Sequence, residues 1–568
     1  MRKKFAALLF LTCLLQLVVV CYLLYEGEKP MVGAPVKTAE IETVWKIEDT
    51  HKAQEEIEGF TLYAEDVCLP YDRTTHTFYW PLPLNSADWP ETQIDVSRDL
   101  RVQAYWVDDY TWDDKNTAVA EGTRYEIIAC DSEKYAYYGL VFTGMPSLSV
   151  ETQTDEIDQE RAPAYVRIYD PDRDHYIETE SEIRLRGTTA QFSGALKQSY
   201  RFWMTKPGHG GKLGERSESL LGMRTNDSWN LLAIYADESL MREKAGMDIW
   251  HGFGAGGGEN FCDFSGEYVE VFVNNEYQGV YLLGETIDKK ALTSRNRTSY
   301  FQQDYLYRGV LAWVDWAFRY PIFPDPVVWE TDRFGYHLRY PEYKNGIVPE
   351  EAWEPLKEFL TLQDTMDAQS LQNRAPDVLD VPGIVDYWLF LQALALTDND
   401  GNNLNIWAHD TNRGYIYSIF PWDLSNSWGG ISNTNRIGAL MDDWLWEEKP
   451  EMLFTYFGGR IHFRLGDRLL AVNAANSREY AMKRWMQLRK SVLSEDAIET
   501  QITGYAHRLN DSGAAVRNFA RWKSDGSYVN LCEDMTLWLQ VRCGLLDEYF
   551  EHINWEELWS QRVAEDEV

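Results

Sequence analysis

The sequence predicts an α+β fold, and the order of its strand-like and helix-like patterns is the reason. Residues 60–146 contain short runs of alternating apolar and polar side chains separated by Pro, Asn and Asp, as is typical of a small β-sandwich. Strand patterns continue to about residue 285, around one helical region, and helical periodicity dominates from residue 350 onward. Because 45% of the 568 residues are apolar and 14% are aromatic, wholesale disorder is excluded.

A basic N-terminus precedes an apolar stretch long enough to span a bilayer. Basic residues at positions 2–4 are followed by an uncharged segment from Phe5 to Leu24. No Ala-x-Ala cleavage site follows, so we expect an uncleaved anchor rather than a cleaved signal peptide. The basic flank keeps the N-terminus in the cytoplasm and the rest outside the membrane. We therefore expect a signal-anchor at residues 1–28, an acidic linker at residues 29–59 and a single-pass, extracytoplasmic protein.

Charge and cysteine usage exclude several classes of function. The formal net charge of -36 argues against nucleic-acid binding, because no basic face could outweigh such a field. The cysteines show neither a CxxC motif nor a Cys/His spacing, which argues against a zinc site. Their scattered positions do not indicate a disulfide framework. One disulfide bond, between Cys68 and Cys130, stays an alternative if the domain is exported to an oxidising compartment. Neither GxSxG nor HExxH, motifs typical of hydrolases, is present.

Cations gather on the first strands after the predicted sandwich. Residues 164–169, 182–187 and 196–205 are predicted strands; Arg186 ends the second, and Lys197 and Arg201 lie on the third. A lysine and an arginine on adjacent strands can pair with phosphate oxygens, and solvated cations at a sheet edge are the alternative.

The chain between residues 229 and 349 mixes helix, hairpin and irregular patterns. Residues 229–250 are predicted to be helical, with Asp237 and Ser239 near the start. A hairpin turning at residues 274–276 follows, and its end at Glu285 is where the chain is expected to cross between two lobes. Residues 289–349 look irregular, either an insertion covering a cleft or a plain surface excursion.

A helix, an Asp/Asn-rich loop and a strand hairpin form the stretch with the clearest chemistry. Asp380 and Pro382 suit a helix start, and residues 384–396 are too apolar for a surface helix. Residues 405–409 and 415–420 are predicted strands.

The polar residues of this stretch are the candidates for catalysis. They are Asp398 and Asp400 in the loop, Asn405 five positions after Asp400, and Asp423 after the second strand. Such acids and an amide serve phosphoryl transfer, in which one Asp orients the acceptor hydroxyl while an Asn and a second Asp hold Mg²⁺. Protein kinases have the same order. A polar loop with a capped strand end is the alternative, because Asp and Asn also fill ordinary turns.

Five sequence blocks, in this order, resemble the CotH kinase family of spore-coat CotH-like proteins. The blocks are RLRGTTAQFSGALKQSYRF (184–202), NLLAIYADESLMREKAGMDIW (230–250), YVEVFVNNEYQGVYLLGETID (268–288), NLNIWAHD (403–410) and FPWDLSNSWG (420–429). The resemblance covers roughly residues 146–551. It implies an atypical, minimal protein-kinase-like domain with two lobes and C-terminal helices at residues 147–555, followed by an acidic tail at residues 556–568. It also implies phosphate transfer from ATP to serine in protein substrates.

The resemblance also assigns roles to individual residues. It implies that Asp400 is the catalytic acid, with Asp398 as its rival, and that Asn405 is its partner at the metal. Asp423 would be the principal ligand of Mg²⁺ or Mn²⁺. The resemblance makes Lys197 the lysine that contacts the nucleotide phosphates, with Arg186 beside it.

Two features of the family pattern differ or stay open in this chain. Thr188 stands where the family often has Asn. The glutamate that pairs with Lys197 is open between Glu238 and Glu243.

Two hypotheses of function follow. The first is a membrane-anchored, ATP- and metal-dependent kinase that phosphorylates serine, or threonine, in proteins of the cell surface or spore coat. The second is a catalytically inactive, surface-anchored binding protein on a kinase-like scaffold, because ATP is scarce outside the membrane. Converging acids with Lys197 favour the enzyme, since a pure scaffold has no need for them.

Overall fold

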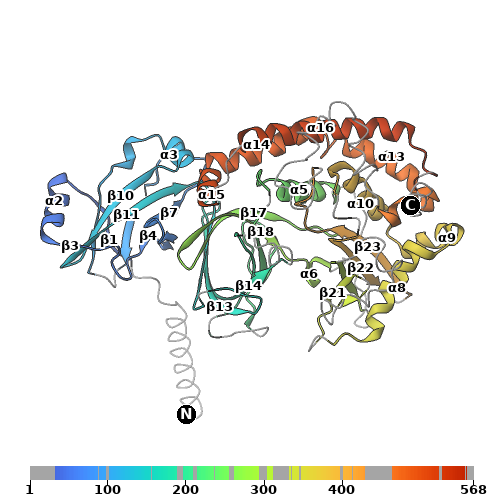
Figure 1. Ribbon diagram of the computed structural model, residues 1–568, viewed down its shortest axis with the longest axis horizontal. Coiled ribbons are helices and arrows are strands. Elements are labelled where there is room, and N and C mark those ends of the chain that lie inside the picture. The colour runs from blue at the N-terminus through green and yellow to red at the C-terminus, as the bar shows by residue number, and fades with distance from the viewer. Residues whose placement is uncertain are drawn as a thin grey trace, which may run out of the picture.

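The computed structural model describes residues 32–558, except for 87, 92, 98–100, 155, 188–195, 207, 209–213, 236, 255–260, 293–302, 311–331, 334, 344–346, 397–398, 400, 412, 429–462, 523–527 and 557. The protein is a mixed α+β chain, as the sequence predicts. Three bodies of β-structure follow one another along the chain, and C-terminal helices run across the second and third (Figure 1). Within this described part, no helix has the length and apolar character needed to cross a membrane. The predicted span from Phe5 to Leu24 lies outside it.

The N-terminal body has two sheets around a shared core. The smaller sheet has the order β1 (Val32–Pro35), β8 (Ile94–Ser97), β4 (Leu62–Ala64), β5 (Val67–Cys68); the larger has the order β2 (Lys37–Thr38), β9 (Gln103–Trp106), β10 (Arg124–Cys130), β11 (Lys134–Thr143), β7 (Thr77–Pro81), β6 (Tyr71–Asp72), with β3 (Lys52–Ala53) beside β11. Leu62 of the smaller sheet and Leu140 of the larger are buried in the same core. The described residues of this body also form the helical segments α2 (Ile41–Thr50), η1 (Tyr110–Trp112) and α3 (Lys115–Glu121).

Two sequence expectations bear on this body. Residues 32–53 fall in the segment expected as an acidic linker, and here β1 and β2 from that segment pair with β8 and β9. Cys68 and Cys130 are free thiols, so the bond that the sequence left open is not formed.

A closed barrel forms the second body. Its strands, in spatial order, are β12 (Ser147–Thr152), β13 (Ala162–Asp170), β14 (His175–Arg186), β15 (Ser199–Met204), β16 (Ser228–Leu232), β18 (Glu276–Glu285) and β17 (Gly266–Val273), and β12 closes on β17 in parallel. The predicted hairpin at the β17–β18 turn is confirmed, because Asn274 and Asn275 both adopt positive φ, as a two-residue turn requires.

The predicted helix over residues 229–250 is wrong in its first part. Trp229 and Leu231 lie on β16 and are buried inside the barrel. The helix, α5, spans Arg242–Gly254. Alternating Trp and Leu side chains fill the barrel here, so the tertiary environment overrides a pattern that also suits a helix. Asp237 does organise the turn before α5, because its carboxylate accepts the Arg242 N–H at 2.8 Å.

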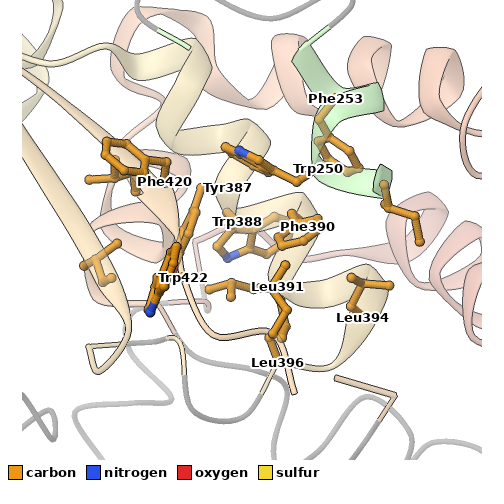
Figure 2. Packing of buried hydrophobic residues seen from close by; sticks show 14 of the residues in the cluster. Trp250, Phe253, Tyr387, Trp388, Phe390, Leu391, Leu394, Leu396, Phe420 and Trp422 are labelled. Carbon is orange, nitrogen blue, oxygen red and sulfur yellow. The ribbon is translucent and has the colours of Figure 1, made fainter. Parts of the chain in front are cut away.

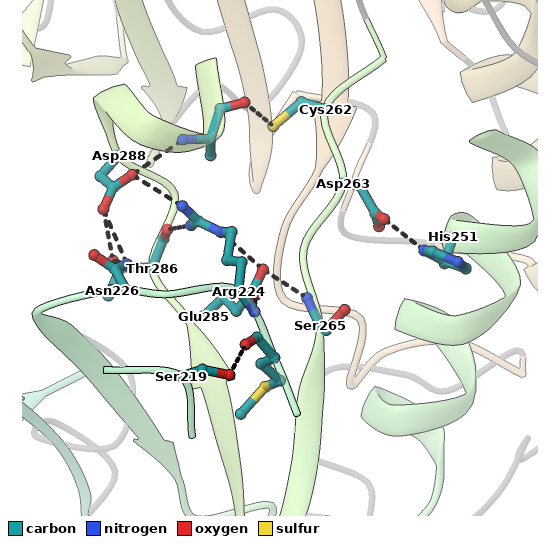
Figure 3. A network of polar contacts seen from close by, with 12 residues as sticks. Ser219, Arg224, Asn226, His251, Cys262, Asp263, Ser265, Glu285, Thr286 and Asp288 are labelled. Carbon is teal, nitrogen blue, oxygen red and sulfur yellow. Dashed lines mark hydrogen bonds and ion pairs between the residues drawn. The ribbon is translucent and has the colours of Figure 1, made fainter. Parts of the chain in front are cut away.

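A polar network fixes the chain where it leaves the barrel (Figure 3). The Glu285 carboxylate at the end of β18 accepts hydrogen bonds from the Arg224 guanidinium at 3.0 Å and from the Ser265 N–H at 3.3 Å. Arg224 also lies 3.4 Å from Asp288, just before α6 (Lys289–Leu292). This exit is therefore held by charge-assisted hydrogen bonds rather than left as a loose connector.

The third body combines a five-stranded sheet with helices. The sheet order is β20 (Asp332–Arg333), β21 (Tyr336–Tyr340), β19 (Tyr305–Gly309), β22 (Leu404–Asp410), β23 (Tyr415–Pro421). The helical segments are η4 (Glu350–Trp353), α8 (Glu354–Leu360), η5 (Thr361–Thr365), α9 (Ala368–Val378), α10 (Val381–Leu394), α12 (Arg464–Ala471), η7 (Ala474–Asn476), α13 (Ser477–Leu488), α14 (Glu495–Asp511), α15 (Ala514–Trp522) and α16 (Tyr528–His552).

Helix α10 lies at the centre of the largest core. Asp380 caps it by accepting the Gly383 N–H, and the helix is buried along nearly its whole length, as its apolar sequence predicts. Trp250 of α5 packs edge-on against Phe390 of α10, with ring centroids 5.1 Å apart (Figure 2). This packing joins α5 to α10, the helix that precedes the Asp/Asn-rich loop.

Candidate functional site

The β22–β23 hairpin, which the sequence predicted, places Asn405 at the end from which the chain runs on to Asp423. Asn405 lies opposite Phe420 in the antiparallel register, and Asp423 follows β23 by two residues. The buried Asn405 amide donates to the carbonyl oxygens of Phe420 at 3.4 Å and Pro421 at 3.3 Å. The hairpin therefore positions the predicted metal amide beside the segment that carries the predicted metal acid.

Asp423 presents an exposed carboxylate from an unusual backbone conformation. Its φ is 54°, in the left-handed region that L-residues rarely adopt. The Ser425 hydroxyl donates to its carboxylate at 2.9 Å. The next N–H, that of Leu424, donates to the Glu243 carboxylate at 2.7 Å. Contacts on the following residues thus hold the backbone that orients this acid.

Glu243 is a buried acid in the first turn of α5. Burial, together with the negative charge of Asp423, raises its pKa to about 8, against the opposing effects of the Leu424 N–H and Arg186. A Cβ at Gly246, one turn later, would lie 2.9 Å from Leu424, so α5 fits closely against this residue. Sequence reasoning considered Glu243 only as a partner for Lys197, whereas its carboxylate contacts the Asp423 loop.

Asp398 and Asp400 lie outside the described residues, but Asn399 between them is described. Its buried side chain donates to the Trp422 carbonyl oxygen at 2.8 Å. Its own carbonyl oxygen accepts the Tyr387 hydroxyl of α10 at 2.6 Å. The Asp/Asn-rich loop is therefore anchored to the residue before Asp423. No sequence signal distinguished Asn399 from its polar neighbours.

Two arginines contact the Trp422 ring from opposite bodies of the fold. Arg186 ends β14 of the barrel, and its guanidinium carbon lies 5.3 Å from the ring centroid. Arg308 of β19 lies 4.4 Å from the same centroid and donates to the Asn405 side-chain oxygen at 2.9 Å. Burial lowers the pKa of Arg186 to about 10, although Asp423 and Glu243 favour its charged form. The predicted Arg186 is thus next to the acids, and Arg308 is an addition from a segment that looked irregular.

Lys197 has a different environment. Its ammonium is buried, donates to the Val280 carbonyl oxygen and to the Asn518 side chain at 3.1 Å, and lies 4.5 Å from the Tyr281 ring centroid. Burial places its pKa well below the ordinary value. These contacts come from β18 and α15, whereas Asn405 and Asp423 are held by β19, β23 and α5. The nucleotide role of Lys197 stays a prediction.

The fit of a divalent metal rests on Asp423 and Asn405. Among the residues that the structure describes, no group of three or more His, Cys, Asp or Glu side chains could hold a metal ion. Mg²⁺ in phosphoryl-transfer sites needs only one or two protein ligands, because phosphates and water supply the rest. Asp423 offers an exposed carboxylate, and the Asn405 oxygen keeps one lone pair beyond its bond to Arg308. Carboxylate and amide oxygens are ligand types that such an ion takes.

Comparison with known proteins gives the family. No curated protein sequence matches the chain. The family model described as CotH kinase protein matches residues 183–544, from β14 of the barrel into α16. This match covers more than half of the chain and includes Arg186, Asn405 and Asp423. The chain therefore belongs to the CotH kinase family.

Proposed function

We propose that this protein is an ATP- and divalent-metal-dependent protein kinase that phosphorylates serine, with threonine as the alternative acceptor. The observation that carries the proposal is the convergence of Asn405, Asp423 and two arginines around Trp422 at one end of the β22–β23 hairpin. A carboxylate, an amide and cations in one place suit a metal-bound polyphosphate. Family membership supports the same chemistry.

The proposal gives each side chain a task. Asp423 and Asn405 hold Mg²⁺ or Mn²⁺, which neutralises negative charge on the phosphates when bound. Asp400 orients the acceptor hydroxyl and accepts its proton, and Asp398 is the alternative for that task. In this proposal the barrel with α5 corresponds to one lobe of a minimal kinase, and the five-stranded sheet with α10 to the other.

The proposed setting of the enzyme follows from its first residues. The segment from Phe5 to Leu24 would anchor the chain in the membrane, with the kinase domain at the cell surface or spore envelope. The substrate would be a surface or spore-coat protein that presents a serine hydroxyl. ATP would have to be supplied in that compartment.

The first test is calorimetric titration of the full-length protein with ATP, with and without Mg²⁺ or Mn²⁺. We expect metal-dependent binding that Asp423→Asn removes, because the amide is a much weaker metal ligand than the carboxylate. Asp377→Asn is the matched control, since Asp377 is exposed on α9 and its loss should leave binding unchanged. Absence of metal-dependent ATP binding by the folded wild-type protein would favour the inactive scaffold instead.

A second variant separates binding from transfer. Asp400→Asn should bind ATP and metal like the wild type and lower the rate of phosphate transfer by roughly 10²-fold or more, as loss of a catalytic base does. Transfer is measured with ³²P-labelled ATP and a serine-containing protein mixture. Unchanged transfer in Asp400→Asn together with loss in Asp398→Asn would reassign the acid. Unchanged transfer in both variants would contradict the mechanism.

A further inference from the structure

Three arginines occupy the outer face of the barrel. Arg184 and Arg186 are two residues apart on β14 and therefore share a face. Arg201 of β15 lies directly opposite Arg184 in the antiparallel register. The adjacent side chains of Ile183, before Arg184, and Phe202, after Arg201, are buried in the barrel core, so the arginines project outward.

Two more arginines approach this face from the five-stranded sheet. Arg308 of β19 and Arg186 of β14 contact the same Trp422 ring, which fixes the two strands near each other. Arg339 of β21 is close enough that its charge disfavours the charged forms of Arg186, Arg201 and Arg308. We call these five residues (Arg184, Arg186, Arg201, Arg308, Arg339) the arginine cluster.

Within the arginine cluster, the positive charges act against one another most clearly at Arg201. Burial and the surrounding arginines lower the pKa of Arg201 to about 9, and the charges with the largest effect are those of other arginines. Arg201 bonds to the Ser228 hydroxyl at 3.1 Å, and its guanidinium carbon lies 4.8 Å from the centroid of the Trp203 ring. The buried Nε atoms of Arg184 and Arg201 have no hydrogen-bond partner in the described chain. Cations held together in this way are stabilised when an anion with several charged oxygens lies between them.

We propose that the arginine cluster binds the polyphosphate chain of the nucleotide, and that this task does not fall to Lys197. The proposal rests on the proposed kinase function. Arg308 bonds to Asn405, and Arg186 lies beside Asp423, so the phosphates would meet the metal ligands at one end of the arginine cluster. Guanidinium groups suit this task because they donate two parallel hydrogen bonds to phosphate oxygens. Lys197, bound to Val280 and Asn518, is instead a structural residue.

The test compares three probes on the full-length protein: Mg²⁺-ATP, inorganic tripolyphosphate and adenosine. Their affinities are measured by calorimetry for the wild type, Arg201→Gln and Arg201→Lys. We expect Arg201→Gln to weaken ATP and tripolyphosphate by about tenfold or more, the value of a charge-assisted hydrogen bond. Adenosine binding should be unchanged, and Arg201→Lys should recover part of the lost affinity because it keeps the charge.

Two controls test whether a loss of affinity comes from a folding defect or from a general loss of positive charge. Arg413→Gln removes one cation from the exposed β22–β23 turn and should leave all three affinities unchanged. Arg201→Gln should not lower the thermal midpoint, because it removes a half-buried cation surrounded by like charges. A lowered midpoint would show that Arg201 serves the fold and would count against the proposal.

The outcomes separate this inference from the proposed function. If the wild type does not bind tripolyphosphate, or Arg201→Gln binds it equally well, the inference is overturned. If the wild type transfers phosphate and Arg201→Gln binds ATP with wild-type affinity, the proposed kinase function stands and the proposed phosphate site is wrong. If ATP and tripolyphosphate bind in a way that depends on the arginine cluster, but no phosphate is transferred to protein, the phosphate site stands and the proposed kinase function is wrong.

Discussion

Asp423 keeps a backbone conformation that costs about 1–3 kcal/mol for a residue with a side chain, so its surroundings must favour it. The hydrogen bond from Leu424 to Glu243 is the clearest of these contacts. It links a helix of the barrel side to the loop after β23. A carboxylic acid at this position accepts the N–H whether it is protonated or ionised.

Glu243 should therefore make stability depend on pH in the metal-free protein. Its folded-state pKa of about 8 exceeds its ordinary value of 4.5, so the folded protein keeps a proton that the unfolded chain releases. This contribution is complete below pH 4.5 and is lost as the pH rises toward 8. Urea denaturation in EDTA between these pH values should show a falling free energy of unfolding, with a flatter dependence in Glu243→Gln.

Two comparisons sharpen this prediction. Glu243→Gln keeps an acceptor for the Leu424 N–H, whereas Glu243→Ala leaves that buried donor without one and should be about 1–3 kcal/mol less stable than Glu243→Gln at every pH. Equal pH slopes in the wild type and Glu243→Gln would show that Glu243 does not titrate in this range.

Among the elements, β19 supports the Asp/Asn-rich loop by direct backbone contact. The Asn403 N–H donates to the Gly309 carbonyl oxygen at 3.0 Å. A Cβ on Gly309 would lie 1.8 Å from the Gly401 carbonyl oxygen, a distance at which one of the two backbones must move. Only glycine permits this approach, which lies next to Arg308 and its bond to Asn405.

Gly309→Ala should therefore displace the loop and lower phosphate transfer by about tenfold or more, because small misplacements at a catalytic loop are costly. The rate is measured with ³²P-labelled ATP. Gly504→Ala is the matched control: Gly504 is in α14, a Cβ there meets nothing within 4 Å, and the activity should be unchanged. Wild-type transfer by Gly309→Ala would show that the loop tolerates the shift.

Across the whole molecule, a buried polar network joins the N-terminal body, the barrel and α15. The Arg517 guanidinium of α15 binds the fully buried Glu270 carboxylate of β17 through two contacts of 2.9 Å. Thr143, the last residue of β11, donates to Glu270 at 2.6 Å, and Tyr79 of β7 stacks on Tyr277 of β18. The three bodies are therefore held by specific contacts at this junction.

Arg517→Met should lower the free energy of unfolding by about 3–5 kcal/mol, because it leaves the Glu270 carboxylate buried without its cation. Urea denaturation measures the change. The double variant Arg517→Met with Glu270→Gln should recover part of the loss, since no uncompensated charge remains. A single-variant loss below about 1 kcal/mol would show that water or another group compensates Glu270.

Much of the fold could be predicted because local patterns agreed with the tertiary structure. The apolar run after Asp380 and Pro382 became the buried α10, and the period-two runs on either side of residues 411–414 became β22 and β23. The helix prediction for Trp229–Leu232 was wrong because a short apolar run fits a barrel strand as well as a helix. Arg308 and Arg339 were missed because aromatic and proline residues made their segment look irregular.

The sequence by itself determined the family, the α+β class, and the order of Asn405 and Asp423 around a hairpin, since these depend on short-range patterns and on motif order. Only the tertiary structure decided which distant residues meet. Glu243 faces the Asp423 loop rather than Lys197, and arginines from β14 and β19 share the Trp422 ring. The physical reason is that partner choice depends on how whole strands and helices pack, which spacing along one chain does not encode.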